Sequence, residues 1–139
     1  MDLQKQFEIF RVYPGEDLWE RIQEEALKSG HGSHAVVTCV GSLRQCFIRL
    51  AGATPEKQLI TEIPGPLEIV SLTGTIIQDR AHLHISVSDC KGTVFGGHLV
   101  KGSLVDTTAE VVLANLKTCG YNLTREMDSK TGFRELVVK

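Results

Sequence analysis

Three histidines have the side-chain chemistry and the spacing needed to hold a metal ion. His82 and His84 lie two residues apart in His82–Ser88, a segment whose alternating apolar residues predict a strand. Residues two apart in a strand point to the same face of the sheet. The third histidine, His98, lies in the next segment with strand character, Val94–Val100. The sequence therefore offers three imidazoles on two neighbouring strands.

The turn between these strands determines which residues face one another. Asp89-Cys90-Lys91-Gly92 has Asp first and Gly last, which is typical of a type I turn followed by a left-handed glycine. If Asp89 pairs with Thr93, His98 lies directly opposite His84. The same register places the large apolar side chains of both strands on the other face, and a one-residue slip would mix the two sets. Because opposed Cβ atoms lie roughly 4.5–5.5 Å apart, the three imidazoles are expected to converge.

Three neutral imidazoles form a ligand set for Zn²⁺ or a similar divalent ion, with a fourth position open for water or another ligand. We therefore predict a metal site formed by His82, His84 and His98. The alternative is a solvated polar strand face that carries histidines without a ligand. His31 and His34 follow the predicted helix in a glycine-rich turn, and we expect them to be loop residues without such a role.

Catalysis would need more than the metal, because a metal hydrolase also uses a general acid or base beside the metal-bound water. Three glutamates are candidates by strand position alone: Glu62, Glu68 and Glu110. Three basic residues are candidates for holding an anionic substrate: Arg44, Arg49 and Lys101. The alternative for each of the six is an exposed surface residue. The sequence therefore leaves the catalytic residues unassigned.

Hydropathy patterning predicts the elements that position these residues. Phe7–Tyr13 alternates as a strand, and Pro14-Gly15-Glu16-Asp17 begins a helix that ends at Gly30, a natural left-handed stop. The segment Glu110–Leu116 fits either a strand or a helix. The other predicted strands are Ala35–Val40, Leu43–Leu50, Gln58–Ile63, Leu67–Ile77 with a bulge at Gly74, and the terminal hairpin Leu123–Met127 and Phe133–Val138.

Length and composition restrict the class of protein. The chain has 139 residues, 42% of them apolar and 23% charged, which favours one folded domain over residues 1–139. A net charge of −2 argues against a generally basic protein that holds nucleic acid by charge alone. No segment approaches the ~18 apolar residues of a membrane span, and the polar N-terminus does not resemble a secretory signal.

The four cysteines, Cys39, Cys46, Cys90 and Cys119, are widely spaced and lack a C-x-x-C pair. Because disulfides are rare in reducing compartments, we interpret them as buried thiols. A cytoplasmic location is expected, with a nuclear location as the alternative.

Several ordered motifs resemble the PPC (plants and prokaryotes conserved) domain family, the domain of AT-hook-type DNA-binding proteins. These motifs are Pro14-Gly15-Glu16-Asp17-Leu18, Gly65-Pro66-Leu67-Glu68-Ile69-Val70-Ser71-Leu72-Thr73-Gly74, His82-Leu83-His84-Ile85-Ser86, Gly96-Gly97-His98-Leu99, Thr107-Thr108-Ala109-Glu110-Val111-Val112-Leu113 and Thr131-Gly132-Phe133. The resemblance implies an α+β fold with a strongly bent, mainly antiparallel sheet packed on one principal helix, assembled as a homotrimer. It also implies that Glu110–Leu116 is a strand.

The resemblance implies two functions. The first is a zinc-binding homotrimeric module with a regulatory, nucleic-acid-associated role, with His82, His84 and His98 carrying the family's metal pattern. DNA enters only through the family's label, because the AT-hook core Arg-Gly-Arg-Pro is absent from this sequence. The alternative is a zinc-dependent hydrolase or lyase, since the fold is similar to that of acetolactate decarboxylase. Fold alone does not decide between them, so whether the chain is an enzyme stays open.

Overall fold

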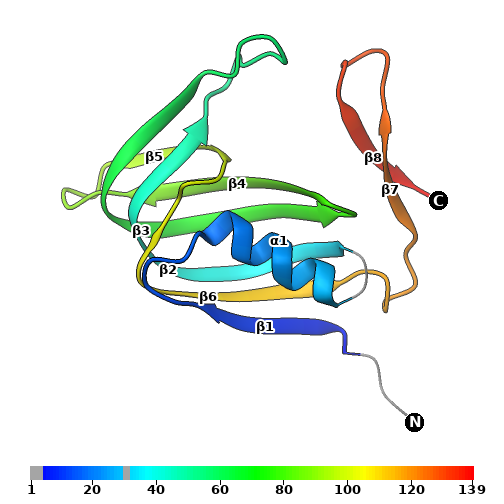
Figure 1. The fold of residues 1–139 in the computed structure, drawn as a ribbon, viewed down its shortest axis with the longest axis horizontal. Coiled ribbons are helices and arrows are strands. Elements are labelled where there is room, and N and C mark those ends of the chain that lie inside the picture. The colour runs from blue at the N-terminus through cyan, green and yellow to red at the C-terminus, as the bar shows by residue number, and fades with distance from the viewer. Residues whose placement is uncertain (1–4, 30–31) are drawn as a thin grey trace.

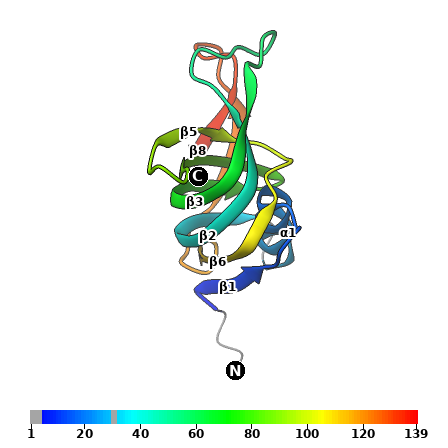
Figure 2. The ribbon, with the colours of Figure 1, turned by 90° about the vertical axis from the view of Figure 1, so that its left-hand side faces the viewer.

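A bent antiparallel sheet with one helix packed against it forms the body of the protein (Figures 1 and 2). The computed structural model describes residues 5–29 and 32–139. Its elements are β1 (Phe7–Val12), α1 (Leu18–Lys28), β2 (Ser33–Arg49), β3 (Ile60–Ile77), β4 (Arg80–Ser88), β5 (Val94–Leu99), β6 (Val105–Asn115), β7 (Leu123–Met127) and β8 (Arg134–Val138). The predicted α+β class and antiparallel sheet are confirmed.

The strand order explains the bend of the sheet. Six strands follow the order β1-β6-β2-β3-β4-β5, and β2 also pairs with β5 through Ile48 and Arg49. One end of β2 therefore meets the far edge of the sheet, which curls the sheet around its core. The strands β7 and β8 form a separate two-stranded hairpin on the side of the molecule where β3 ends and β4 begins (Figure 1). This arrangement brings Arg49 of β2 beside His98 of β5.

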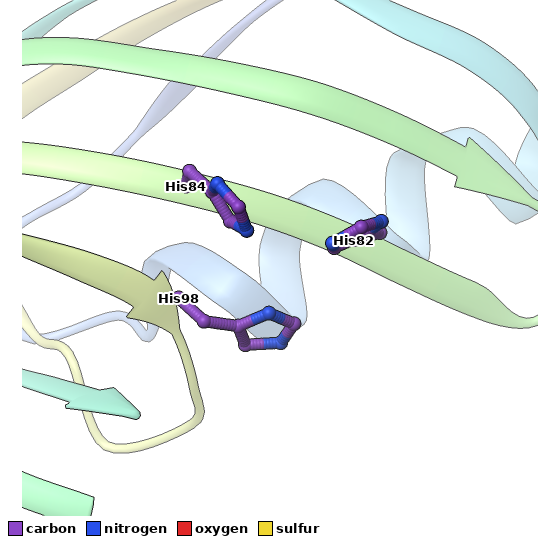
Figure 3. Close-up of side chains that lie close together, drawn as sticks. All are labelled: His82, His84 and His98. Carbon is purple, nitrogen blue, oxygen red and sulfur yellow. The ribbon is translucent and has the colours of Figure 1, made fainter. Parts of the chain in front are cut away.

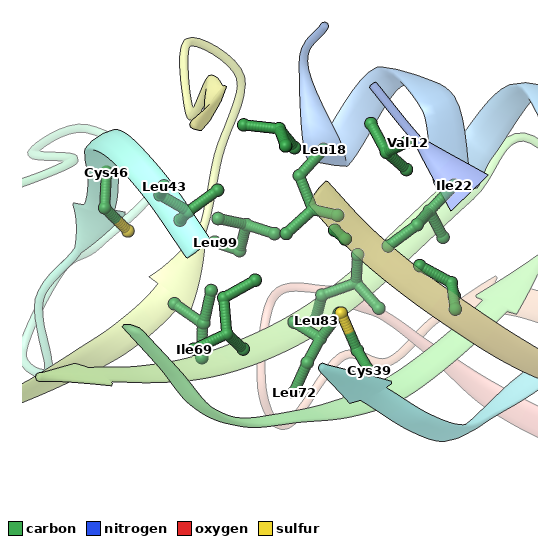
Figure 4. Packing of buried hydrophobic residues seen from close by; sticks show 14 of the residues in the cluster. Val12, Leu18, Ile22, Cys39, Leu43, Cys46, Ile69, Leu72, Leu83 and Leu99 are labelled. Carbon is green, nitrogen blue, oxygen red and sulfur yellow. The ribbon is translucent and has the colours of Figure 1, made fainter. Parts of the chain in front are cut away.

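The helix begins and packs as its sequence predicts. Asp17 caps α1, because its Oδ1 accepts a hydrogen bond from the Glu20 N–H at 3.1 Å. Leu18, Ile22 and Ala26 lie on one face of the helix and are buried against the sheet (Figure 4). The predicted stop at Gly30 lies outside the described residues. The helix is too short and too polar to cross a bilayer, and the described residues contain no other helix that could do so.

Two strands are longer than predicted. The predicted strands Ala35–Val40 and Leu43–Leu50 join into the single strand β2, which ends one residue earlier at Arg49, and its pairing with β6 shifts after Gly41 instead of ending there. The predicted strands Gln58–Ile63 and Leu67–Ile77 likewise join into β3, which begins at Ile60 and continues through the Gly65–Pro66 segment. The Gly65–Pro66 segment stays within β3 because the pairing of β3 with β2 shifts register between Leu43 and Gln45 of β2. The length of β2 lets its far end pair with β5 at Ile48 and Arg49.

The predicted bulge at Gly74 is wrong. The irregularity of β3 lies between Ile69 and Ser71, whereas Gly74 pairs directly with Leu83 of β4. Gly74 has φ +142, and a Cβ there would lie 2.0 Å from the carbonyl oxygen of His82. Glycine is needed because the backbone of β4 passes close to it, so this residue fixes the strand that carries two of the histidines. The strand alternative for Glu110–Leu116 is confirmed, since most of that segment belongs to β6.

The cysteine prediction is correct for two of the four thiols. Cys39 and Cys46 are buried in the core, and burial raises their pKa values to about 12 and about 11. Cys90 and Cys119 are exposed, because both lie in turns instead of strands. All four are free thiols.

Candidate metal centre

The β4–β5 hairpin has the register that its turn predicts. His84 pairs with His98, and the Asp89 N–H donates to the Thr93 carbonyl at 3.0 Å. Gly92 is left-handed with φ +78. The Asp89 carboxylate accepts hydrogen bonds from the backbone N–H groups of Lys91 and Thr93 at 2.9 and 3.0 Å. These contacts hold the turn and therefore place His98 across from His84.

The three imidazoles converge on one side of the hairpin, as Figure 3 shows. The ring centroid of His82 lies 5.1 Å from that of His84 and 5.3 Å from that of His98, and the His84–His98 separation is 5.7 Å. Each ring offers a nitrogen that lies within 4.8 Å of the nitrogens offered by the other two. His82 and His84 are exposed, whereas His98 is half-buried. The predicted ligand set is thus brought together.

The opposite face of β4 anchors the site in the core. Leu83, Ile85 and Val87 alternate with the histidines and are buried among the apolar side chains of the sheet and α1 (Figure 4). A rotation or slip of β4 that moved His82 or His84 away would expose these side chains to water. Hydrophobic burial on one face therefore fixes the imidazoles on the other.

The surroundings of His98 and His82 favour the neutral form of these two imidazoles. Burial, helped by the charge of Arg49 and then by His82 and His84, lowers the pKa of His98 to about 4. His82 is exposed at its surface but loses part of its hydration in the groove that it lines, and this desolvation, followed by the charges of His84 and Arg125, lowers its pKa. A neutral imidazole has one nitrogen lone pair free for a metal, and a protonated imidazole has none. The lowered pKa values of His98 and His82 therefore favour the metal-binding form of these two ligands.

His82 and His98 line a groove of about 560 Å³. Its other walls come from α1, β2, the β3–β4 turn and the β7–β8 hairpin. The remaining lining residues are Trp19, Arg49, Asp79, Arg80, Ala81, Arg125, Phe133, Arg134 and Glu135. The volume is in the range of small-molecule sites, so a ligand of that size fits beside the imidazoles.

The structure separates the anion candidates. Arg49 Nη2 lies 3.4 Å from His98 Nδ1, and Arg49 lines the groove. Arg44 is exposed and does not line it. Lys101 instead pairs with Glu20 at 3.8 Å and lies over the Trp19 ring. Of the three, Arg49 alone reaches the histidines.

The glutamate candidates do not line the histidine groove. Glu62 lines a different groove of about 360 Å³. Glu68 and Glu110 are exposed strand residues that lie opposite Ser88 and Arg11 in the sheet register. The acids in the histidine groove are Asp79 and Glu135. Sequence reasoning missed them, together with Arg125 and Arg134, because no local pattern links the β3–β4 turn and the terminal hairpin to the histidine strands. It also missed Arg80, although alternation along β4 places Arg80 on the same face as His82.

The prediction that His34 is a loop residue is wrong. His34 lies in β2 and is completely buried. Its Nδ1 accepts from the Ser33 N–H at 3.1 Å, and its Nε2 lies 3.0 Å from Ser29 Oγ and 3.9 Å from a Glu8 carboxylate oxygen. Burial lowers the pKa of His34, with the Glu8 charge acting against this shift. His34 is therefore a structural histidine, and His31 lies outside the described residues.

Comparisons with known proteins bear on the family and on the metal. A family model described as the Plants and Prokaryotes Conserved (PCC) domain matches residues 4–117. The chain is 40% identical over 129 residues to the bifunctional protein GlmU of a Synechococcus strain, covering 93% of this chain. The chain spans about a fifth of the length of such curated relatives.

Two solved structures have closely similar folds. A hypothetical protein from Salmonella enterica has a TM-score of 0.87 and 28% identity, covering 99% of this chain and 96% of that one. A protein from Archaeoglobus fulgidus, described as metal-containing, has a TM-score of 0.76 and 25% identity, covering 99% of both chains. These similarities extend beyond residue 117, so they include the terminal hairpin.

Proposed function

We propose that this chain, which belongs to the Plants and Prokaryotes Conserved (PCC) domain family, binds zinc or a similar divalent ion through His82, His84 and His98. The observation that carries this proposal is the convergence of three imidazoles from two paired strands, with ligand nitrogens within 4.8 Å of one another. The description of the Archaeoglobus fulgidus protein as metal-containing supports it.

The donor set fits this class of ion. Imidazole nitrogens suit zinc and neighbouring transition metals, whereas Mg²⁺ and Ca²⁺ prefer oxygen ligands. With zinc–nitrogen distances of about 2.0–2.1 Å, tetrahedral ligands lie about 3.3 Å from one another. The present nitrogen spacing needs only small side-chain rotations to reach that value. His82 and His84 are exposed side chains, so such rotations meet little resistance.

We propose that the chain acts as a homotrimeric module. An 11-residue helix is about 16 Å long and covers one face of the sheet. Large apolar side chains stay exposed on the strands, among them Ile9, Val40 and Val70. Burial of such side chains between identical subunits stabilises closed symmetric assemblies. The number three, a regulatory role and an association with nucleic acid come from the resemblance to the family.

The second candidate is a zinc-dependent hydrolase or lyase, and the groove beside the histidines favours it. A bound zinc ion supplies a Lewis acid or an activated water. Asp79 and Glu135 line the same groove and are the carboxylates placed to exchange protons there. Trp19 and Phe133 provide apolar walls that exclude part of the solvent.

Zinc titration of purified, metal-stripped protein tests the metal site. We expect about one zinc ion per chain, because each chain supplies one set of three imidazoles. His84→Ala should weaken zinc binding at least about 100-fold, since two imidazoles leave zinc short of its usual ligand number. Ser86→Ala is the matched control, because Ser86 follows on the same strand face. A wild-type protein that binds no zinc, or a His84→Ala variant that binds it as well as wild type, would contradict the proposal.

A further inference from the structure

The groove beside the three histidines is rich in positive charge. Four arginines line it, against two acids, in a chain whose net charge is −2. The arginines come from four separate segments: Arg49, Arg80, Arg125 and Arg134. A divalent ion on the imidazoles would add two further positive charges. Such a groove has an excess of donors and positive charge that an anion would balance.

Arg125 is a buried arginine, which is unusual for a charged side chain. It is only 7% exposed, and its Nη2 donates to Thr75 Oγ1 at 3.0 Å. Within the described residues, no carboxylate lies within salt-bridge distance of its guanidinium. A guanidinium has five N–H donors, and a buried charge without a partner is costly. The Glu135 carboxylate, which also lines the groove, attracts Arg125 only from beyond salt-bridge distance, so an anion bound there would supply a partner in direct contact.

Arg134 holds Arg125 in place from the neighbouring strand. Arg134 Nη2 donates to the carbonyl oxygen of Arg125 at 2.8 Å. Both residues belong to the β7–β8 hairpin, and the contact with Thr75 fastens this hairpin to β3. The hairpin thereby becomes one wall of the histidine groove.

Metal binding to His98 would remove one of the two side-chain partners of Arg49. Its Nη2 lies 3.4 Å from Nδ1 of His98, and its Nη1 lies 3.4 Å from Gln58 Oε1. A neutral imidazole has a single lone pair, so His98 cannot accept from Arg49 and bind a metal at the same time. Metal binding would therefore free an N–H of Arg49, a residue that lines the groove. A guanidinium presents its donors as a planar fork that matches carboxylate and phosphate oxygens.

We propose that the groove binds a small oxyanion, a carboxylate or a phosphate, between the metal ion on the three histidines and the guanidinium groups of Arg49 and Arg125. This inference rests on the metal site proposed above and names the ligand class of that site. Because metal binding frees Arg49 and adds positive charge, metal and anion bind cooperatively.

Fluorescence of Trp19 reports binding directly, because Trp19 lines the groove and is the chain's single tryptophan. Zinc-loaded and metal-free protein are titrated with inorganic phosphate and with succinate at constant ionic strength. We expect saturable binding at millimolar concentration or below, at least tenfold tighter in the zinc-loaded protein. A preference for phosphate identifies phosphoryl ligands, and a preference for succinate identifies carboxylate ligands.

Arg49→Gln and Arg125→Met should each weaken anion binding at least tenfold. Arg44→Gln, an exposed arginine on the same strand as Arg49, is the matched control and should bind as wild type does. Arg49→Gln keeps the test decisive if Arg125→Met does not fold, because Arg49 lies near the surface of β2.

Zinc content is measured in every sample, so that the two proposals fail separately. A wild-type protein without zinc contradicts the proposed function. A zinc-loaded wild type that binds neither anion contradicts only the oxyanion inference, and so does an Arg49→Gln variant that binds as tightly as wild type.

Discussion

Replacing Gly74 with alanine should damage both stability and the metal site. Gly74 lies between Thr73 and Thr75, the residues that pair with His84 and His82. An added Cβ would lie 2.0 Å from the His82 carbonyl oxygen, whereas real Cβ atoms essentially never approach within 3.0 Å. The strands β3 and β4 must therefore move apart by about 1 Å at this point.

Two costs contribute to the expected loss of stability. A non-glycine residue held at φ +142 costs about 1–3 kcal/mol. Weakening the neighbouring interstrand hydrogen bonds costs about 0.5–1.5 kcal/mol for each bond. We expect Gly74→Ala to lower the free energy of unfolding by about 3 kcal/mol, measured by urea denaturation of metal-free protein. Zinc affinity should fall at least tenfold, because the backbone of His82 is displaced.

Gly92→Ala is the control that separates these costs. Gly92 is also left-handed, with φ +78, but no atom lies within 4 Å of the position that an added Cβ would take. It should lose only the conformational cost, about 1–2 kcal/mol. If Gly74→Ala is no less stable than Gly92→Ala, the close approach of β4 does not explain the glycine, and our account of how β3 positions the histidines is wrong.

Three further predictions concern pH, assembly and DNA. Burial lowers the pKa of His34 in the folded protein, so below pH ~6.5 the unfolded chain binds a proton at this residue that the folded protein does not. As the pH falls, metal-free protein should therefore lose up to about 1.4 kcal/mol of its free energy of unfolding per pH unit from His34. Urea denaturation between pH 7 and 5 should give a shallower slope for His34→Asn, and equal slopes would refute this. Light scattering should give a mass near three times 15.3 kDa, and a mass near 15.3 kDa would rule out the trimer. We expect no tight, sequence-specific DNA binding by this chain alone, given its charge of −2; submicromolar binding of a short duplex at physiological salt would contradict this.

The sequence predicts the histidine hairpin accurately because everything that fixes it is local. Asp89 and Gly92 determine the turn, the turn determines the pairing of His84 with His98, and alternation determines which face is buried. Each of these interactions joins residues fewer than twenty positions apart. The register of such a hairpin is therefore determined by residues within the hairpin itself.

The sequence does not predict the features that depend on distant segments. The continuity of β3 through Gly65–Pro66 depends on a register shift in β2, and the burial of His34 depends on neighbours in β3 and β6. Arg125 reaches the histidine groove from a hairpin about forty residues along the chain, held there by its hydrogen bond to Thr75. Arg49 could be named from the sequence as a candidate anion ligand, but no periodicity within either segment indicates the contact of Arg125 with Thr75, so the part of the groove that Arg125 lines emerges only from the fold.

Anomalous diffraction from crystals of zinc-loaded protein, recorded on both sides of the zinc absorption edge, tests the central claim most directly. We predict one strong zinc peak per chain, at about 2.0–2.1 Å from one nitrogen of each of His82, His84 and His98. A zinc peak bound elsewhere, or no peak among these three imidazoles, would contradict the metal site on which the account depends.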